Sequence, residues 1–196
     1  MRSARCTLTL CLALAAGLAA GNARAASPEP AVPSPSAAAK AQLLYQLGEV
    51  QKMMVALAEG LPQDSYNWRP NEKMRTAGEM FLHTARGNFS QPESWGVKPP
   101  EELTLCGNYL DQGNLEKPKV IDMLRKSFEH ARQSVAAVPD ADLFKTARID
   151  NRESTPYEDI LALVTRNYEN LGRMISYSML KGIIPPWMGG WFTSGS

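Results

Sequence analysis

The sequence of 196 residues has few features that mark a particular class of protein. It has three cysteines and almost equal numbers of basic and acidic side chains, 21 and 20. It contains no P-loop, no glycine-rich dinucleotide-binding pattern and no CxxC or HExxH motif. Without an excess of positive charge, nucleic-acid binding is not expected. A hydrophobic content of 44% and this length are typical of one globular domain.

The N-terminus has the pattern of a secretory signal peptide. Arg2 and Arg5 precede an apolar run at residues 8–20, and an Ala-Arg-Ala sequence ends at Ala25. We predict cleavage after Ala25 and therefore a periplasmic or secreted protein. The alternative is an uncleaved membrane anchor, although the run is shorter than the roughly 20 residues that span a bilayer. No stable membrane span is expected after removal of residues 1–25.

Removal of the signal peptide changes the cysteine and charge content of the chain. Cys6 and Cys11 are lost, so Cys106 remains alone and no intramolecular disulfide can form. Cys106 is then either a reactive thiol or a small packed hydrophobic side chain. Residues 1–25 contain three arginines and no acid, so the mature chain has two more acidic than basic residues.

Composition divides the mature chain into three parts. Residues 26–37 are mainly Pro, Ala and Ser, which cannot bury enough apolar surface to fold, and we predict a disordered tether there. Residues 38–187 form the expected helical domain, and residues 188–196 form a C-terminal tail.

Four segments of this domain have the periodicity of amphipathic helices. We expect helices at about 38–59, from an N-cap at Thr76 to about 88, from about 118 to the residue before Pro139, and from Pro156 to the residue before Gly182. Thr76 with Glu79, and Thr155 with Glu158, have the spacing of capping boxes. No run of alternating strand residues is evident, so the sequence predicts an all-α four-helix bundle. The long connection at 90–117 leaves room for a crossover.

Two stretches of the sequence resemble a known family. The first is Tyr66-Asn-Trp-Arg-Pro70, followed by Met74-Arg-Thr-Ala-Gly-Glu79 and His83-Thr-Ala-Arg-Gly-Asn88. The second is Arg166-Asn-Tyr-Glu-Asn-Leu-Gly-Arg-Met174, continuing to Lys181-Gly-Ile-Ile-Pro-Pro186. Both are similar to segments of the DinB-like four-helix bundles, a family of metalloenzymes distinct from the DNA polymerase of the same name.

This resemblance implies a divalent metal, zinc or nickel, held by one histidine of the second helix and two of the fourth. His83 stands at the second-helix position, but Arg166 and Asn170 occupy the other two. A guanidinium does not give up its proton, and a neutral amide is a poor ligand for zinc or nickel. We therefore predict a degenerate metal site and no cofactor. His83 remains the single retained metal position or is a hydrogen-bonded core histidine.

The only other histidine is His130, which the helical pattern places at the solvent boundary rather than in the cleft. It is a less favoured replacement for a lost metal ligand.

Two functions are compatible with these residues. The favoured one is an exported, non-catalytic DinB-like bundle. In it, His83, Arg166 and Asn170 either line a cleft for a small polar or anionic ligand or satisfy each other's hydrogen bonds in a structural bundle. In that cleft, either an acid such as Glu79 neutralises Arg166 or an anionic ligand does. The alternative, implied by the family, is a metal-dependent hydrolase or a thiol-dependent transferase. A homodimer is compatible with either function.

Overall fold

The computed structural model describes residues 33–111, 114–149 and 152–189. The predicted signal peptide, its cleavage site and most of the predicted tether lie outside the described residues, as does the end of the C-terminal tail. None of the helices in the described ranges is both long enough and apolar enough to span a membrane.

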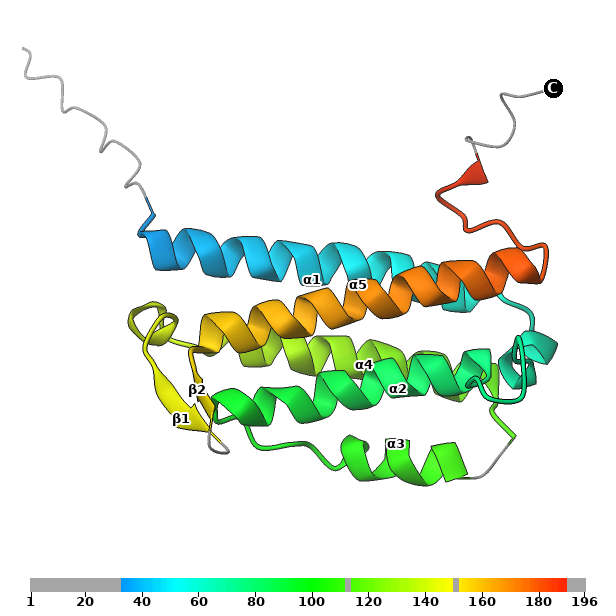
Figure 1. The fold of residues 1–196 in the computed structure, drawn as a ribbon, viewed down its shortest axis with the longest axis horizontal. Helices are drawn as coiled ribbons and strands as arrows, with labels where there is room; N and C mark the ends of the chain where they lie inside the picture. Colours follow the sequence, from blue (N-terminus) through cyan, green and yellow to red (C-terminus); the bar gives the residue numbers. More distant parts are fainter. Residues whose placement is uncertain (1–32, 112–113, 150–151, 190–196) are drawn as a thin grey trace, which may run out of the picture. The chain divides into compact units, whose positions relative to one another are not determined.

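The described chain is mainly helical, with one short β-hairpin (Figure 1). Five α-helices are present in these ranges: α1 (Pro35–Gly60), α2 (Ala77–Ser90), α3 (Glu102–Asp111), α4 (Lys117–Ala136) and α5 (Pro156–Leu180). Three 3-10 helices connect them, η1 (Gln63–Asn67), η2 (Gln91–Trp95) and η3 (Asp140–Asp142), and the hairpin consists of β1 (Ala147–Ile149) and β2 (Arg152–Ser154).

The four predicted helices correspond to α1, α2, α4 and α5, so the all-α bundle is confirmed. Both capping boxes are present. The Glu79 backbone N–H donates to Thr76 Oγ1 at 3.2 Å, and the Glu158 backbone N–H donates to Thr155 Oγ1 at 3.2 Å. Each glutamate accepts in return from the backbone N–H of its threonine. Both helix starts therefore follow from local sequence alone.

Helix α1 begins earlier than the predicted boundary at residue 38. Ser34 accepts a hydrogen bond from the Ala37 backbone N–H, and Pro35 occupies the first helical position. The predicted tether thus overlaps the first turn of a capped helix.

The four long helices form a ring in which α1 and α2 lie diagonally opposite each other. Helix α1 packs against α4 and α5, and α2 packs against the same two helices. Helices α1 and α5 run in one direction, whereas α2 and α4 run in the other (Figure 1). The core consists of buried aliphatic and aromatic side chains from all four helices, among them Leu57, Phe81, Leu124 and Met174.

The connection between α2 and α4 explains why the predicted loop at 90–117 is long. Because α2 and α4 are neighbours and run in the same direction, the chain must return along the bundle before α4 begins. Helix α3 lies in this return segment and packs on α2. The sequence analysis expected a connection without a helix here, which was wrong. Helix α3 gives little sequence signal, because it has 10 residues and Cys106 is the one residue that it buries.

The hairpin was also missed by the sequence prediction. Strands β1 and β2 are three residues each and pair antiparallel, with Ala147 opposite Ser154. Such short strands cannot display a recognisable alternation of polar and apolar residues.

Residues 66–70, the start of the first stretch that resembles the family, hold the ends of three helices together. The Tyr66 hydroxyl donates to the Ala58 carbonyl oxygen at 2.7 Å, and the Trp68 carbonyl oxygen accepts from the Ala77 backbone N–H. The Trp68 ring meets Tyr177 edge to face at 6.1 Å. This motif is therefore structural: it fixes the entry of α2 against α1 and α5.

Candidate functional site

The seam between α2 and α5 contains the three residues singled out from the sequence. These helices are antiparallel: the Tyr177 hydroxyl donates to the Arg75 carbonyl oxygen, and Asn167 Nδ2 donates to Asn88 Oδ1 at 2.8 Å. His83 lies between these two contacts along α2, and Asn170 lies between them along α5. The predicted relation between the two helices is consistent with these contacts.

The three side chains differ in their surroundings. Asn170 is buried, His83 is half-buried and Arg166 is exposed. Arg166 Nη1 donates to Gln91 Oε1 at 2.7 Å, so the guanidinium reaches toward the end of α2. The structure places the three residues on one seam but records no hydrogen bond among them within the described residues.

This donor set does not suit zinc or nickel. His83 offers one nitrogen, Arg166 is a hydrogen-bond donor, and Asn170 Oδ1 accepts from Arg173 Nη1 at 3.4 Å. Over the described ranges, no group of three or more His, Cys, Asp or Glu side chains is placed to hold a metal ion.

Arginine side chains surround His83. Burial is the main cause that lowers the pKa of His83 below its usual value near 6.5, and nearby positive charge lowers it further. The charges come from Arg75, Arg173, Arg166 and Arg86, in decreasing order of effect. In the described part of the chain only Arg173 of these four forms an ion pair, with Glu169. Burial and these positive charges thus both favour the neutral form of the His83 imidazole.

Three of these arginines were not singled out from the sequence. Arg86 follows His83 by three residues and Arg173 follows Asn170 by three, so each shares a helix face with a predicted site residue. That spacing was the available signal. Arg75 lies before α2, where no helical spacing applies.

Glu79 does not neutralise Arg166, and that option was wrong. Its carboxylate accepts from the Thr76 backbone N–H at 2.6 Å and lies 3.6 Å from the Arg69 guanidinium. Because the capping role fixes Glu79 at the start of α2, it cannot reach along the helix to Arg166. Within the described residues Arg166 has Gln91, and no acidic side chain, as its hydrogen-bond partner.

His130 and Cys106 lie away from this seam. The His130 ring packs at 5.8 Å from Phe89, and burial lowers its pKa although Glu102 opposes that shift. Cys106 is fully buried, its Sγ donates to the Leu82 carbonyl oxygen, and burial raises the pKa of its thiol to about 11. Cys106 is therefore a packed side chain rather than a reactive thiolate.

A buried polar chain crosses the core beside the seam. Asn167 donates to Asn88, Asn88 Nδ2 donates to Ser127 Oγ at 3.3 Å, and Ser127 Oγ donates to the Leu124 carbonyl oxygen. These contacts link α5, α2 and α4 in one register, because a buried amide without its partner is costly. Asn88 and Asn167 stand inside the two resemblance motifs, which gives those motifs a second structural role.

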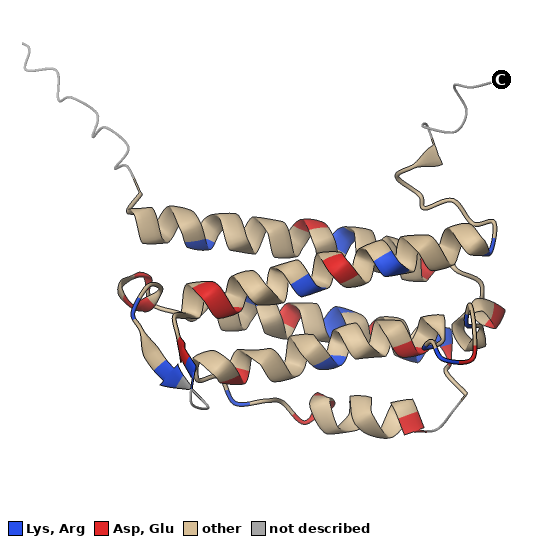
Figure 2. Ribbon diagram, in the orientation of Figure 1, with Lys and Arg blue, Asp and Glu red and all other residues tan. Residues whose placement is uncertain are grey.

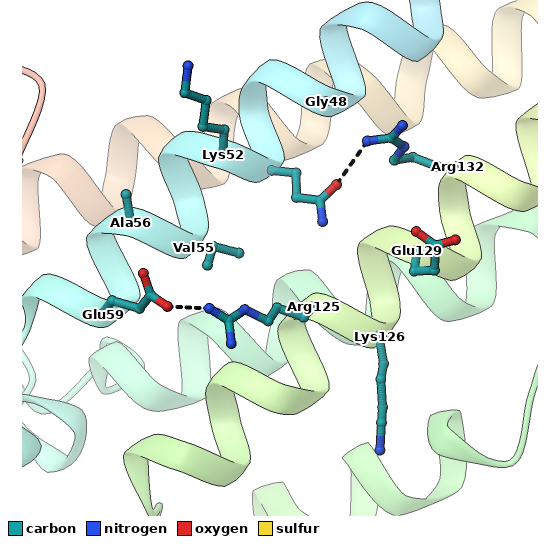
Figure 3. Close-up of a pocket in the computed structure, with 10 residues that line it drawn as sticks. Gly48, Lys52, Val55, Ala56, Glu59, Arg125, Lys126, Glu129 and Arg132 are labelled. Atoms are coloured by element: carbon teal, nitrogen blue, oxygen red, sulfur yellow. Dashed lines mark hydrogen bonds and ion pairs between the residues drawn. The ribbon is translucent and has the colours of Figure 1, made fainter.

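A groove of about 760 Å³ lies on the opposite side of the bundle, between α1 and α4 (Figure 3). Both of its arginines have partners: Arg125 pairs with Glu59, and Arg132 donates to Gln51. Figure 2 shows the same mixture of both signs along the helices, without a separate basic or acidic segment. The α2–α5 seam is the stronger candidate for ligand binding, because three arginines near His83, namely Arg75, Arg86 and Arg166, have no acidic partner among the described residues.

The comparisons with known proteins agree with this fold. A crystal structure of a DinB-like protein from Bacillus cereus ATCC 10987 is similar, with a TM-score of 0.57 and 15% sequence identity. The match covers 76% of this chain and 93% of that chain. No curated protein matches the sequence. The model of the DinB superfamily matches residues 46–169, which include α2, α4 and most of α1 and α5. The chain therefore belongs to the DinB superfamily.

Proposed function

We propose that this protein is an exported, non-catalytic DinB-like bundle that binds a small anionic or polar ligand at the α2–α5 seam. The observation that carries the proposal is the position of four arginines, Arg166 and Arg173 on α5, Arg86 on α2 and Arg75 just before α2, all near enough to His83 for their charges to act on it. Arginine binds carboxylate and phosphate groups through paired hydrogen bonds. Arg75, Arg86 and Arg166 have no acidic partner among the described residues, and an anion at this seam would offset their charge.

The same charges argue against the family's metal at this position. A divalent cation beside His83 would be repelled by Arg166 and Arg173, and it would find one imidazole in place of three. We therefore propose that the metal site of this chain is degenerate and that the protein works without a divalent metal.

Metal analysis of protein purified without a metal-chelating tag tests this proposal. We expect no stoichiometric zinc, nickel or iron in the unmodified protein. The double substitution Arg166→His with Asn170→His creates a His-x-x-x-His pair on α5. We expect this pair to face His83 and to bind zinc in the micromolar range or tighter; binding no better than that of the unmodified protein would show that the assumed register of α5 is wrong. One metal per chain in the unmodified protein, lost on His83→Ala, would instead support the metal-dependent hydrolase or transferase.

Anion binding is tested by following the His83 ring signals by NMR during titration with inorganic phosphate. A bound anion offsets the arginine charges, so we expect the pKa of His83 to rise toward its usual value. The ring signals of His130, which lies away from the seam, serve as the internal control and should not move. Equal shifts of both histidines would contradict a specific site.

Export is tested by intact-mass measurement on protein recovered from the envelope or the medium. We expect a mature chain that begins at Ala26. A full-length chain in the cytosol would overturn this part of the proposal.

A further inference from the structure

A second feature of the seam lies at the end of the bundle where α2 finishes and α5 begins. A cavity of about 620 Å³ is lined there by Gln91, Glu93 and Ser94 on one wall and by Asp159, Ala162 and Arg166 on the other. It extends from the Arg166 end of the seam toward the hairpin, whose Arg152 also lines it. The sequence pattern singled out only Arg166 among these residues.

Asp159 gives this cavity a fixed negative group. The residue is 2% exposed, and its Oδ1 accepts from Ser154 Oγ at 3.0 Å and pairs with Arg152. Among the described residues, its second oxygen, Oδ2, is buried without a hydrogen-bond partner, and so is Ser94 Oγ on the facing wall. A buried carboxylate oxygen without a donor is costly, so the free energy of the site is lowered by a ligand that brings an N–H group.

Arg166 gives the opposite end of the cavity a positive group. It follows Asp159 by seven residues, which is two helical turns and a rise of about 10 Å on the same face of α5. The small side chain of Ala162 lies between them and leaves space along this face. Gln91 holds the arrangement, because its Nε2 donates to the Asp159 carbonyl oxygen and its Oε1 accepts from Arg166. Within the described residues Arg166 has no acidic partner.

We propose that this cavity binds a small zwitterion of dipeptide length, with the ligand's ammonium group at Asp159 and its carboxylate at Arg166. The inference rests on the proposed function and specifies its ligand class. A single amino acid carries both charged groups on one carbon, whereas the ammonium and carboxylate of a dipeptide are separated by two residues, which matches the two-turn spacing of Asp159 and Arg166 better. Two extended residues span about 7 Å, which suits an aspartate and a flexible arginine two turns apart.

Calorimetric titration of the purified protein with L-alanyl-L-alanine tests this proposal. Two blocked peptides serve as matched probes: N-acetyl-L-alanyl-L-alanine lacks the ammonium group, and L-alanyl-L-alanine amide lacks the carboxylate. We expect the free dipeptide to bind and each blocked form to lose about tenfold or more in affinity, because each lacks one charged hydrogen-bonded contact. These probes need no substitution, so the result does not depend on the folding of a variant.

Variants then assign the two contacts. Asp159→Asn should weaken the free dipeptide but not the N-acetylated one, and Arg166→Gln should weaken the free dipeptide but not the amide. Arg132→Gln, in the groove on the other side of the bundle, removes the same charge as Arg166→Gln and should leave binding unchanged.

The outcomes separate this inference from the proposed function. If phosphate shifts His83 but the dipeptide binds no better than its N-acetylated form, the seam is an anion site and the zwitterion inference is wrong. If neither phosphate nor the dipeptide binds, both proposals are wrong.

Discussion

The hydroxyl of Tyr66 carries a contact whose loss can be predicted from the structure. Tyr66 is fully buried, and its hydroxyl donates to the Ala58 carbonyl oxygen at 2.7 Å. In an α-helix this carbonyl would accept from the backbone N–H four residues later, but that residue is Pro62, which has none. Burial, with a smaller contribution from Glu59, raises the pKa of Tyr66 above its usual value, so the hydroxyl stays a donor.

Replacement of Tyr66 by Phe should therefore lower the free energy of unfolding more than the removal of an exposed hydroxyl does. The ring and its packing at 5.8 Å from Phe81 are retained, so the change removes the hydrogen bond alone. The Ala58 carbonyl is then buried without a donor, and we expect a loss of about 2 kcal/mol in the free energy of unfolding. For a domain of this size, that loss lowers the Tm by about 4–8 °C.

Urea denaturation followed by circular dichroism measures this loss, with Tyr45→Phe as the matched control in α1. Tyr45 is 60% exposed, so its substitution should change the free energy of unfolding by less than about 0.5 kcal/mol. The dependence of that free energy on urea should be the same in all three proteins. If Tyr66→Phe is no less stable than Tyr45→Phe, the Tyr66 hydroxyl does not replace the missing donor and the reasoning fails.

Three further predictions concern other parts of the bundle. Thr155→Ala removes the side-chain acceptor at the start of α5 and should lower the free energy of unfolding, measured by thermal or chemical denaturation, by about 1 kcal/mol. Gly78→Ala should destabilise the protein by about 1–3 kcal/mol, because a Cβ there would lie 2.9 Å from the Tyr66 carbonyl oxygen. Gly87→Ala in the same helix is the control: its Cβ would have nothing within 4 Å, and it should stabilise the protein by up to about 1 kcal/mol. An equal loss of stability in both variants would contradict the close approach at Gly78. Folding lowers the pKa of His83, so below about pH 6.5 the unfolded chain binds more protons than the folded one. The free energy of unfolding should therefore decrease as the pH is lowered below about 6.5, and it should decrease less in His83→Gln.

The sequence by itself determined the four long helices and the starts of α2 and α5. Apolar spacing, Thr76 with Glu79, and Thr155 with Glu158 are local signals that act within one or two turns, and the structure contains each of them. The end of α5 was also determined by a local signal, because Gly182 has a φ of 73°, which other residues rarely adopt. The family resemblance also followed from short motifs, which hold helix ends and a buried polar chain in place.

The tertiary structure alone decided how these helices are arranged and which side chains meet. The parallel course of α2 and α4, helix α3 and the short hairpin depend on packing between distant segments, which no local periodicity reports. The surroundings of His83 depend on arginines from two helices and a loop. Likewise, Asp159 faces a cavity because η2 folds back against the start of α5. Charge and burial at a site come from neighbours in space, and the sequence pattern specifies only neighbours along the chain.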